Sequence, residues 1–187
     1  SDPVEPPWLS RAEVLRGAHG FDRGALALGG ASPYVTHPGY DAAPLQVRVE
    51  AGSRGYGKRQ VSSGQVLGDL DYYVALTDSE YDGYQDHSSG SSKGIAANVG
   101  YRFNPKLETR LYIRYREEYH ENSGTLTLAQ LKKNSKQTNA ATYATRGDST
   151  KRGSTWVGSK TTYTFDDDAR RRRIVVVRLA EHLAAVA

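Results

Sequence analysis

The sequence predicts an all-β protein in which each strand pairs antiparallel with the next one, as an up-and-down meander. Two observations predict this fold class. From residue 45 onward, apolar residues recur at every second position in successive segments, as they do in strands with one apolar face. The connections between these segments alternate between short turns and long polar loops, which is typical of an up-and-down barrel. Composition agrees, because 19 Gly and 13 Tyr in 187 residues suit strands joined by wet loops better than packed helices.

The first 40 residues differ from the rest of the chain. Residues 1–12 hold three of the 7 prolines and predict an irregular segment. Residues 13–40 place glycines between short apolar stretches, which is typical of short strands joined by tight turns. We therefore expect a small unit of short strands before the meander.

Residues 41–168 contain the alternating segments. In "LQVRVEA", Leu45, Val47 and Val49 fall on one face of an extended chain, and polar residues fall on the other face. The same alternation predicts six strands, at 45–51, 58–66, 70–76, 93–103, 107–117 and 154–165. Short reversals are expected at 67–69 and 104–106, and long polar connections at 77–92 and 118–150.

The two faces of these strands have opposite character. One carries Leu, Val, Ile, Ala and Tyr, and the other carries Arg, Glu, Gln and Asp. A membrane barrel has this alternation, and so does a soluble sandwich with its polar side chains outward. Aromatic residues gather near strand ends, which favours the aromatic belts of a membrane barrel or, alternatively, ordinary cross-strand pairs. These residues are Tyr101, Phe103, Tyr115, Tyr163 and Phe165.

Residues 169–187 form an atypical tail, rich in Arg, Val, Ala and Leu, in which the period of two is lost. One hypothesis is that this tail is translated out of frame. The alternative is an amphipathic helix with Val175, Leu179, Leu183 and Val186 on one face. Drawn as a structure, the tail is expected to be a helix or a loose strand. The arginine run at 170–173 would be costly against lipid, at about 2–4 kcal/mol per residue at mid-bilayer.

Composition and motifs narrow the function classes. The net charge of +4 lies mostly in the arginine run, so we expect no nucleic-acid partner. A chain with 0 Cys and 0 Met, starting at Ser1, is expected to be processed or a fragment. "EEYHE" at 117–121 favours a solvated loop over a metal site, and "GSRGYGKR" at 52–59 favours a hairpin loop over a phosphate loop. No catalytic residue, metal site or cofactor is predicted.

Two stretches together resemble the TonB-dependent outer-membrane receptors. Residues 14–36, "VLRGAHGFDRGALALGGASPYVT", resemble the closing segment of the family's plug domain. Residues 68–92, "GDLDYYVALTDSEYDGYQDHSSGSS", followed by "ANVGYRF", resemble the second to fourth barrel strands of the siderophore-receptor branch. The residues that match the plug pattern, with a structural and gating role implied, are Glu13, Val14, Leu15, Arg16, Gly17, Gly24, Gly29, Gly30, Val35 and Thr36.

The resemblance implies an incomplete outer-membrane β-barrel, residues 41–168, preceded by a remnant of a plug domain, residues 1–40. Family members hold a plug inside a barrel of about 22 strands in the cell outer membrane. They import a ferric siderophore or a similar chelate without covalent chemistry, so the chain is not expected to be an enzyme. The implied partners are the chelate, outer-membrane lipid and the TonB complex, which would act through an N-terminal part that this chain lacks.

The polar loop after the third strand supplies the candidate ligand-binding residues Tyr81, Tyr84 and His87. Tyrosine offers a chelate a flat apolar ring and a polar hydroxyl. The alternatives are packing of the two tyrosines against the barrel wall and a hydrogen-bonding role for His87 within its loop.

A second class of function also fits the residues. The chain could be a soluble or secreted β-rich binding module for a saccharide or a protein, with its apolar faces joined in a sandwich. As a piece of a barrel it would have open sheet edges, so we expect it to aggregate when expressed alone and to fail at transport. A sharp, reversible unfolding of a monomer would contradict that expectation.

Overall fold

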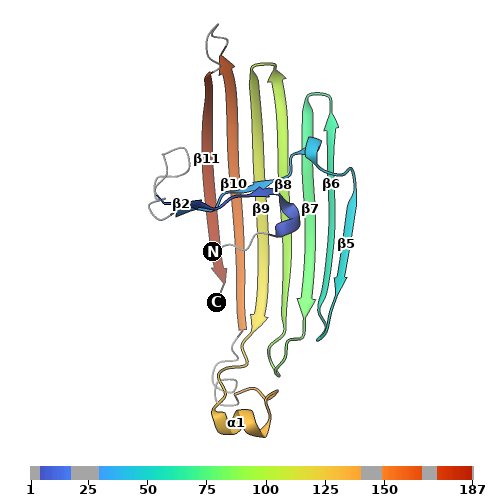
Figure 1. The fold of residues 1–187 in the computed structure, drawn as a ribbon, viewed down its shortest axis with the longest axis vertical. Coiled ribbons are helices and arrows are strands. Elements are labelled where there is room, and N and C mark those ends of the chain that lie inside the picture. The colour runs from blue at the N-terminus through green and yellow to red at the C-terminus, as the bar shows by residue number, and fades with distance from the viewer. Residues whose placement is uncertain (1–4, 18–29, 140–148, 166–171, 187) are drawn as a thin grey trace.

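The computed structural model describes residues 5–17, 30–139, 149–165 and 172–186, with backbone alone for residues 30, 31 and 172–186. It contains one seven-stranded antiparallel sheet whose strands follow each other in chain order (Figure 1). The strands are β5 (Gln46–Ala51), β6 (Gly57–Leu67), β7 (Leu70–Tyr81), β8 (Gly90–Asn104), β9 (Leu107–Glu121), β10 (Ser149–Phe165) and β11 (Arg172–Val186). The all-β meander is confirmed, and the sheet is open, with β5 and β11 at its edges.

The six expected strands are present, but five of them are longer than their apolar alternation, β6 by one residue at each end. β7 runs to Tyr81 and β8 begins at Gly90, so the loop expected at 77–92 shrinks to 82–89. β9 and β10 likewise extend into the region expected to be a polar connection, pairing as far as Glu121 opposite Ser149. Backbone hydrogen bonds continue the ladder where the side chains have become polar. A search for apolar periodicity cannot detect these polar strand ends.

The tail continues the meander. β11 pairs with β10 from Arg172 opposite Phe165 to Val186 opposite Lys151. The amphipathic-helix alternative is therefore wrong for these residues. The run "IVVV" consists of β-branched residues that favour strands, and the free edge of β10 offers them backbone partners. The hypothesis of translation out of frame stays a prediction.

Short and long connections lie at opposite ends of the sheet (Figure 1). The short-turn end holds residues 68–69 and 105–106, where the Asn104 side chain accepts hydrogen bonds from the backbone of Lys106 and Leu107. The loop end holds residues 52–56, 82–89 and the β9–β10 connection, which includes helix α1 (Leu128–Lys133). Helix α1 starts with a capping box formed by Thr127 and Gln130. No helix among the described residues is long and apolar enough to cross a bilayer.

The N-terminal residues lie across one face of the sheet as a strap (Figure 1). The strap comprises residues 5–12 and 34–42: η1 (Pro6–Trp8), β1 (Leu9–Ala12), β4 (Tyr34–Thr36) and η3 (Gly39–Asp41), with β1 antiparallel to β4. A second short pair, β2 (Leu15–Arg16) and β3 (Gly30–Ala31), adjoins it in sequence. The approach is close at Gly39, where a Cβ would lie 2.5 Å from backbone atoms of Gln65 and Tyr72.

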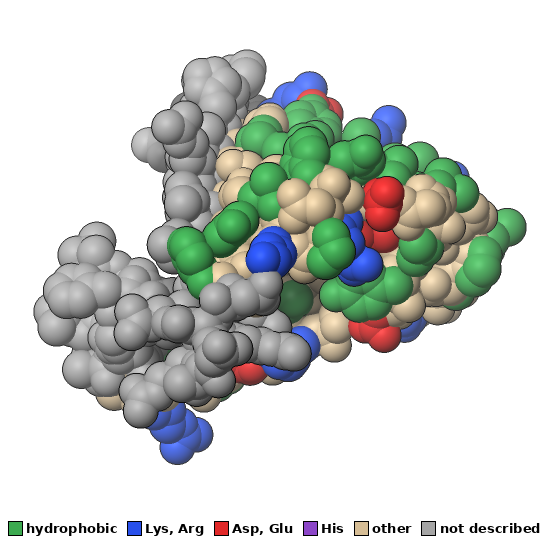
Figure 2. Space-filling model, turned by 90° about the horizontal axis from the view of Figure 1, so that it is seen from above, with side chains coloured by type: hydrophobic (Ala, Val, Ile, Leu, Met, Phe, Trp, Pro, Cys, Tyr) green, Lys and Arg blue, Asp and Glu red, His purple; other side chains and the backbone are tan. Residues whose placement is uncertain are grey.

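The face under the strap is polar, and the opposite face is apolar. A small core forms where Trp8 of the strap meets Tyr73, Ala75 and Ala96 of the sheet. The opposite face carries exposed hydrophobic side chains in successive rows across the strands, including Val61, Leu76, Ile95, Leu111, Ile113 and Tyr115. Seen along the strands, hydrophobic side chains cover much of the visible described surface (Figure 2).

Candidate functional site

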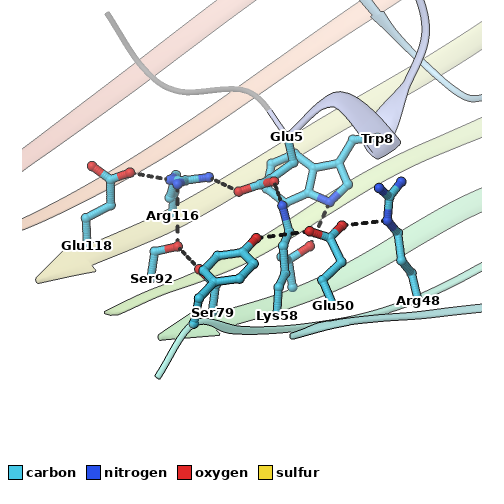
Figure 3. A network of polar contacts seen from close by, with 11 residues as sticks. Glu5, Trp8, Arg48, Glu50, Lys58, Ser79, Ser92, Arg116 and Glu118 are labelled. Atoms are coloured by element: carbon cyan, nitrogen blue, oxygen red, sulfur yellow. Dashed lines mark hydrogen bonds and ion pairs between the residues drawn. The ribbon is translucent and has the colours of Figure 1, made fainter. Parts of the chain in front are cut away.

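The strap is held on the sheet by a buried ion cluster around Glu5. Glu5 is only 7% exposed, and its carboxylate accepts hydrogen bonds from Lys58 of β6 and, at 2.6 Å, from Arg116 of β9. Arg116 also donates to Glu118 at 2.6 Å and to Ser92 at 3.4 Å (Figure 3). A carboxylate this deeply buried needs such partners, because removing one partner would leave an uncompensated charge.

The surroundings of Glu5 favour its charged form. Burial alone would raise the pKa of this carboxyl, but the hydrogen bonds and positive charges of Lys58 and Arg116 outweigh burial and hold the pKa below its ordinary value of 4.5. Glu5 therefore stays ionised in mildly acidic solution, and its ion pairs persist there.

Trp8 fixes the strap next to this cluster. Its side chain is 0% exposed, and its indole nitrogen donates to the Thr77 hydroxyl of β7 at 3.1 Å (Figure 3). The ring lies over Gly94 of β8, where a Cβ would come within 2.7 Å of it. Gly94 thus leaves the space that the indole ring occupies.

A second anchor lies nearer the short-turn end, around Arg110 of β9. Its guanidinium makes a bidentate pair with Asp71 at 2.8 and 2.9 Å, and it also donates to Glu108 and to the Asn98 side chain. Asp71 in turn accepts from the backbone of Gly39 at 2.9 Å, and the Asn98 amide donates to the backbone oxygen of His37 at 3.0 Å. Both anchors therefore join strap and sheet through groups that have several partners.

Protonation of Glu5 is expected to loosen the strap. Because the folded pKa lies below the unfolded value, the stabilisation is fully present above about pH 4.5 and is lost as pH falls through the folded pKa. The chain has 2 tryptophans, so in a Trp156→Phe background only Trp8 fluoresces as tryptophan. Its fluorescence emission then reports release of the strap. We expect a red shift on acidification. Glu5→Gln should shift the Trp8 emission to longer wavelength already at neutral pH and reduce its further change on acidification. Glu80→Gln changes an exposed carboxylate and should leave the acid-induced shift unchanged. An unchanged acid response in Glu5→Gln would contradict the assignment.

The structure places the three predicted ligand residues at the loop end, each with a different partner. Tyr81 ends β7 and lies over Gly90, its neighbour on β8, which is the arrangement of the alternative in which it packs against the sheet. The Tyr84 hydroxyl lies 2.8 Å from that of Ser135, and the Arg54 guanidinium lies 4.7 Å from the centre of its ring. His87 adopts a φ of 57° and places Nδ1 3.4 Å from Glu121.

These contacts join two long connections into one loop layer, formed by residues 82–89 and 121–139. The backbone of Asp86 donates to that of Lys136 at 2.7 Å, and Ser123 donates to the Gln85 side chain at 2.6 Å. Glu121 accepts from the hydroxyl of Ser89 at 2.7 Å. Tyr81 and Tyr84 remain 42% and 47% exposed, so part of each ring stays available to a ligand.

Of the plug-pattern residues, Glu13 pairs with Arg11 at 2.9 Å, Arg16 pairs with Gly30 in the β2–β3 ladder, and Gly17 has a φ of 86°. Gly24 and Gly29 lie outside the described residues. The sequence gives no signal for Glu5, Trp8, Lys58 or Arg116, because the first two lie in the segment expected to be irregular. Their partners are far away along the chain: Glu5 and Arg116 are 111 positions apart.

Within the described ranges, no three His, Asp or Glu side chains gather closely enough to hold a metal ion. No protein-family model matches the chain, and no curated protein matches it.

Proposed function

We propose that the chain forms part of a TonB-dependent outer-membrane receptor for a ferric siderophore or a similar chelate. In this proposal the sheet is a piece of the barrel wall, and the strap belongs to the plug. One observation carries the proposal: the exposed face of the sheet is an apolar band with polar borders, whereas the face under the strap is polar and holds buried ion pairs.

The band consists of rows of neighbouring side chains on successive strands. One row joins Val61, Leu76, Ile95 and Tyr115, and the next joins Val74, Ala97, Ile113 and Val157. Toward the loop end, the row beyond Tyr115 switches to alternating charges, Arg59, Asp78, Lys93 and Glu117. Such a border between apolar and charged rows is what a strand has where it leaves hydrocarbon for water.

Aromatic pairs border the band at the short-turn end. Tyr101 and Phe103 lie 4.8 Å apart between ring centres, and Tyr163 and Phe165 lie 4.6 Å apart, both edge to face. From Leu107 to Tyr115 the strand covers about 27 Å, or about 21 Å along the normal at a tilt of about 40°. This height is close to the apolar band of about 25 Å that outer-membrane barrels present to lipid.

The other face agrees with a barrel lumen that contains a plug. Its buried polar side chains Asn98 and Arg110 hydrogen-bond to the strap or to each other rather than packing against a second apolar sheet. The loop layer would then face the outside of the cell and offer Tyr81, Tyr84 and His87 to the chelate. TonB would supply the energy for import.

The experiment compares single cysteines, because the chain has 0 Cys of its own. Leu76→Cys lies within the band, and Glu80→Cys lies on the same face of β7 beyond the charged row. With the chain in phospholipid vesicles, a water-soluble maleimide should label position 80 rapidly and position 76 at least about tenfold more slowly. Equal labelling, together with a monodisperse chain in the absence of detergent, would instead support the soluble binding module.

A further inference from the structure

A cavity of about 580 Å³ lies between the strap and the sheet at the short-turn end. Thr36, Pro38 and Tyr40 line it from the strap side, and residues of β8, β9 and β10 line it from the sheet. Its volume is in the range of small-molecule sites. Asn98, Glu108 and Arg110 of the second anchor form part of its wall, and the lining residues next to the turn at 105–106 place it at the opposite end of the sheet from the loop layer.

Cationic side chains dominate the lining of the cavity. Arg102, Lys106, Arg110 and Lys160 line it, and Glu108 is the one carboxylate among the described lining residues. Arg110 is already committed, because Asp71, Glu108 and Asn98 accept hydrogen bonds from its guanidinium. Arg102 and Lys160, by contrast, have no acidic side chain within 4.0 Å among the described residues.

Arg102 and Lys160 approach the cavity from two sides. Arg102 of β8 is opposite Glu108 of β9, which is opposite Thr162 of β10, and Lys160 lies two residues along from Thr162. Two strand spacings and two residues separate their Cα atoms by about 12 Å, so both long side chains reach a common ligand. Tyr112 and Thr162 also line the cavity, and their hydroxyls make no hydrogen bond with the described residues.

We propose that this cavity binds a small polyanion that carries phosphate or carboxylate groups. An anion between Arg102 and Lys160 would accept charge-assisted hydrogen bonds from both, and Tyr112 and Thr162 would add neutral donors. A partly enclosed site strengthens these interactions relative to water. Of the nearby carboxylates, Asp71 and Glu108 pair with Arg110, and Asp69 lines an adjoining cavity of about 150 Å³ that shares Tyr40, Arg102 and Glu108 with this one. The proposal does not depend on a membrane location.

The test is calorimetric titration of the folded full chain in detergent with two probes, tripolyphosphate and citrate. We expect saturable binding of at least one probe with a stoichiometry near one, weakening as salt is raised. Arg102→Gln/Lys160→Gln should lower the affinity at least about tenfold. Lys132→Gln/Lys133→Gln removes the same charge from helix α1 and should leave the affinity unchanged.

The two probes distinguish the chemistry of the ligand. Binding of tripolyphosphate alone assigns a phosphate ligand, and binding of citrate alone assigns a carboxylate ligand. Absence of saturable binding by the folded chain, or an equal loss in the two double variants, overturns the proposal. Circular dichroism and Trp8 emission verify folding. Thr162→Glu serves as a further variant that places a carboxylate between the two cations, and unchanged affinity in it would also overturn the proposal.

Discussion

Trp8→Ala is expected to release the N-terminal strap from the sheet while the sheet itself stays folded. The substitution removes the largest fully buried side chain of the small core and the hydrogen bond to Thr77. A buried tryptophan replaced by alanine costs about 3–5 kcal/mol. The seven-stranded ladder does not depend on this side chain, so we expect local release rather than global unfolding.

Tryptic cleavage after Arg11, a residue of β1, measures the release. If cleavage requires the strap to open, a loss of about 3 kcal/mol raises its rate about a hundredfold. Tyr34→Ala is the matched control, because Tyr34 is an aromatic strap residue that is 56% exposed, and it should change the rate little. Gly94→Leu provides a second route to the same result, since its side chain would enter the space of the indole ring. Similar rates in Trp8→Ala and Tyr34→Ala would show that Trp8 does not hold the strap.

Ala97→Arg is expected to prevent stable association of the chain with a bilayer. Ala97 lies in the middle of the apolar band, between Val74 on β7 and Ile113 on β9. An arginine that faces lipid near the midplane costs about 2–4 kcal/mol, and the cost falls to about 0–1 kcal/mol near the interface. A loss of 30-fold or more, on the order of 2 kcal/mol, is therefore expected in the membrane-bound fraction.

Flotation with phospholipid vesicles measures that fraction. Ser91→Arg is the matched control, because Ser91 lies on the same strand and the same face but beyond the charged row. It replaces a small residue by the same arginine and should float as the unchanged chain does. Equal flotation of both variants would mean that the apolar band does not face hydrocarbon, and the membrane part of the proposed function would fail with it. The polyanion cavity would be unaffected, since it lies on the other face.

Some of the structure could be predicted from residues alone because it depends on local geometry. Alternation of side chains across a strand follows from the backbone, so "LQVRVEA" and "LETRLYIRYRE" indicate strands without any knowledge of their neighbours. The tight turn after Asn104 is equally local, since the Asn104 side chain caps its own turn. The same reasoning places Tyr84 and His87 in a polar loop, as observed, whereas Tyr81, expected in that loop, is the last residue of β7.

The strand ends and the tail needed the three-dimensional arrangement. The polar ends of β7 and β9 are strands because a neighbouring ladder continues beside them, and β11 is a strand because β10 offers a free edge. The tail "ARRRRIVVVRLAEHLAAVA" contains both strand-favouring and helix-favouring residues. Where local preference is mixed, pairing with a neighbour decides the conformation.

By itself, then, the sequence determined the all-β class, the order of the strands in the meander and the opposite character of their two faces, because these follow from the two-residue period of an extended chain. Only the tertiary structure decided which polar residues are buried and paired. Glu5 meets Lys58 and Arg116, and Arg102 and Lys160 share a cavity, because the strap crosses strands that are far away in the chain. No local sequence pattern encodes these side-chain contacts, because their energy depends on distances that exist only once the sheet has formed.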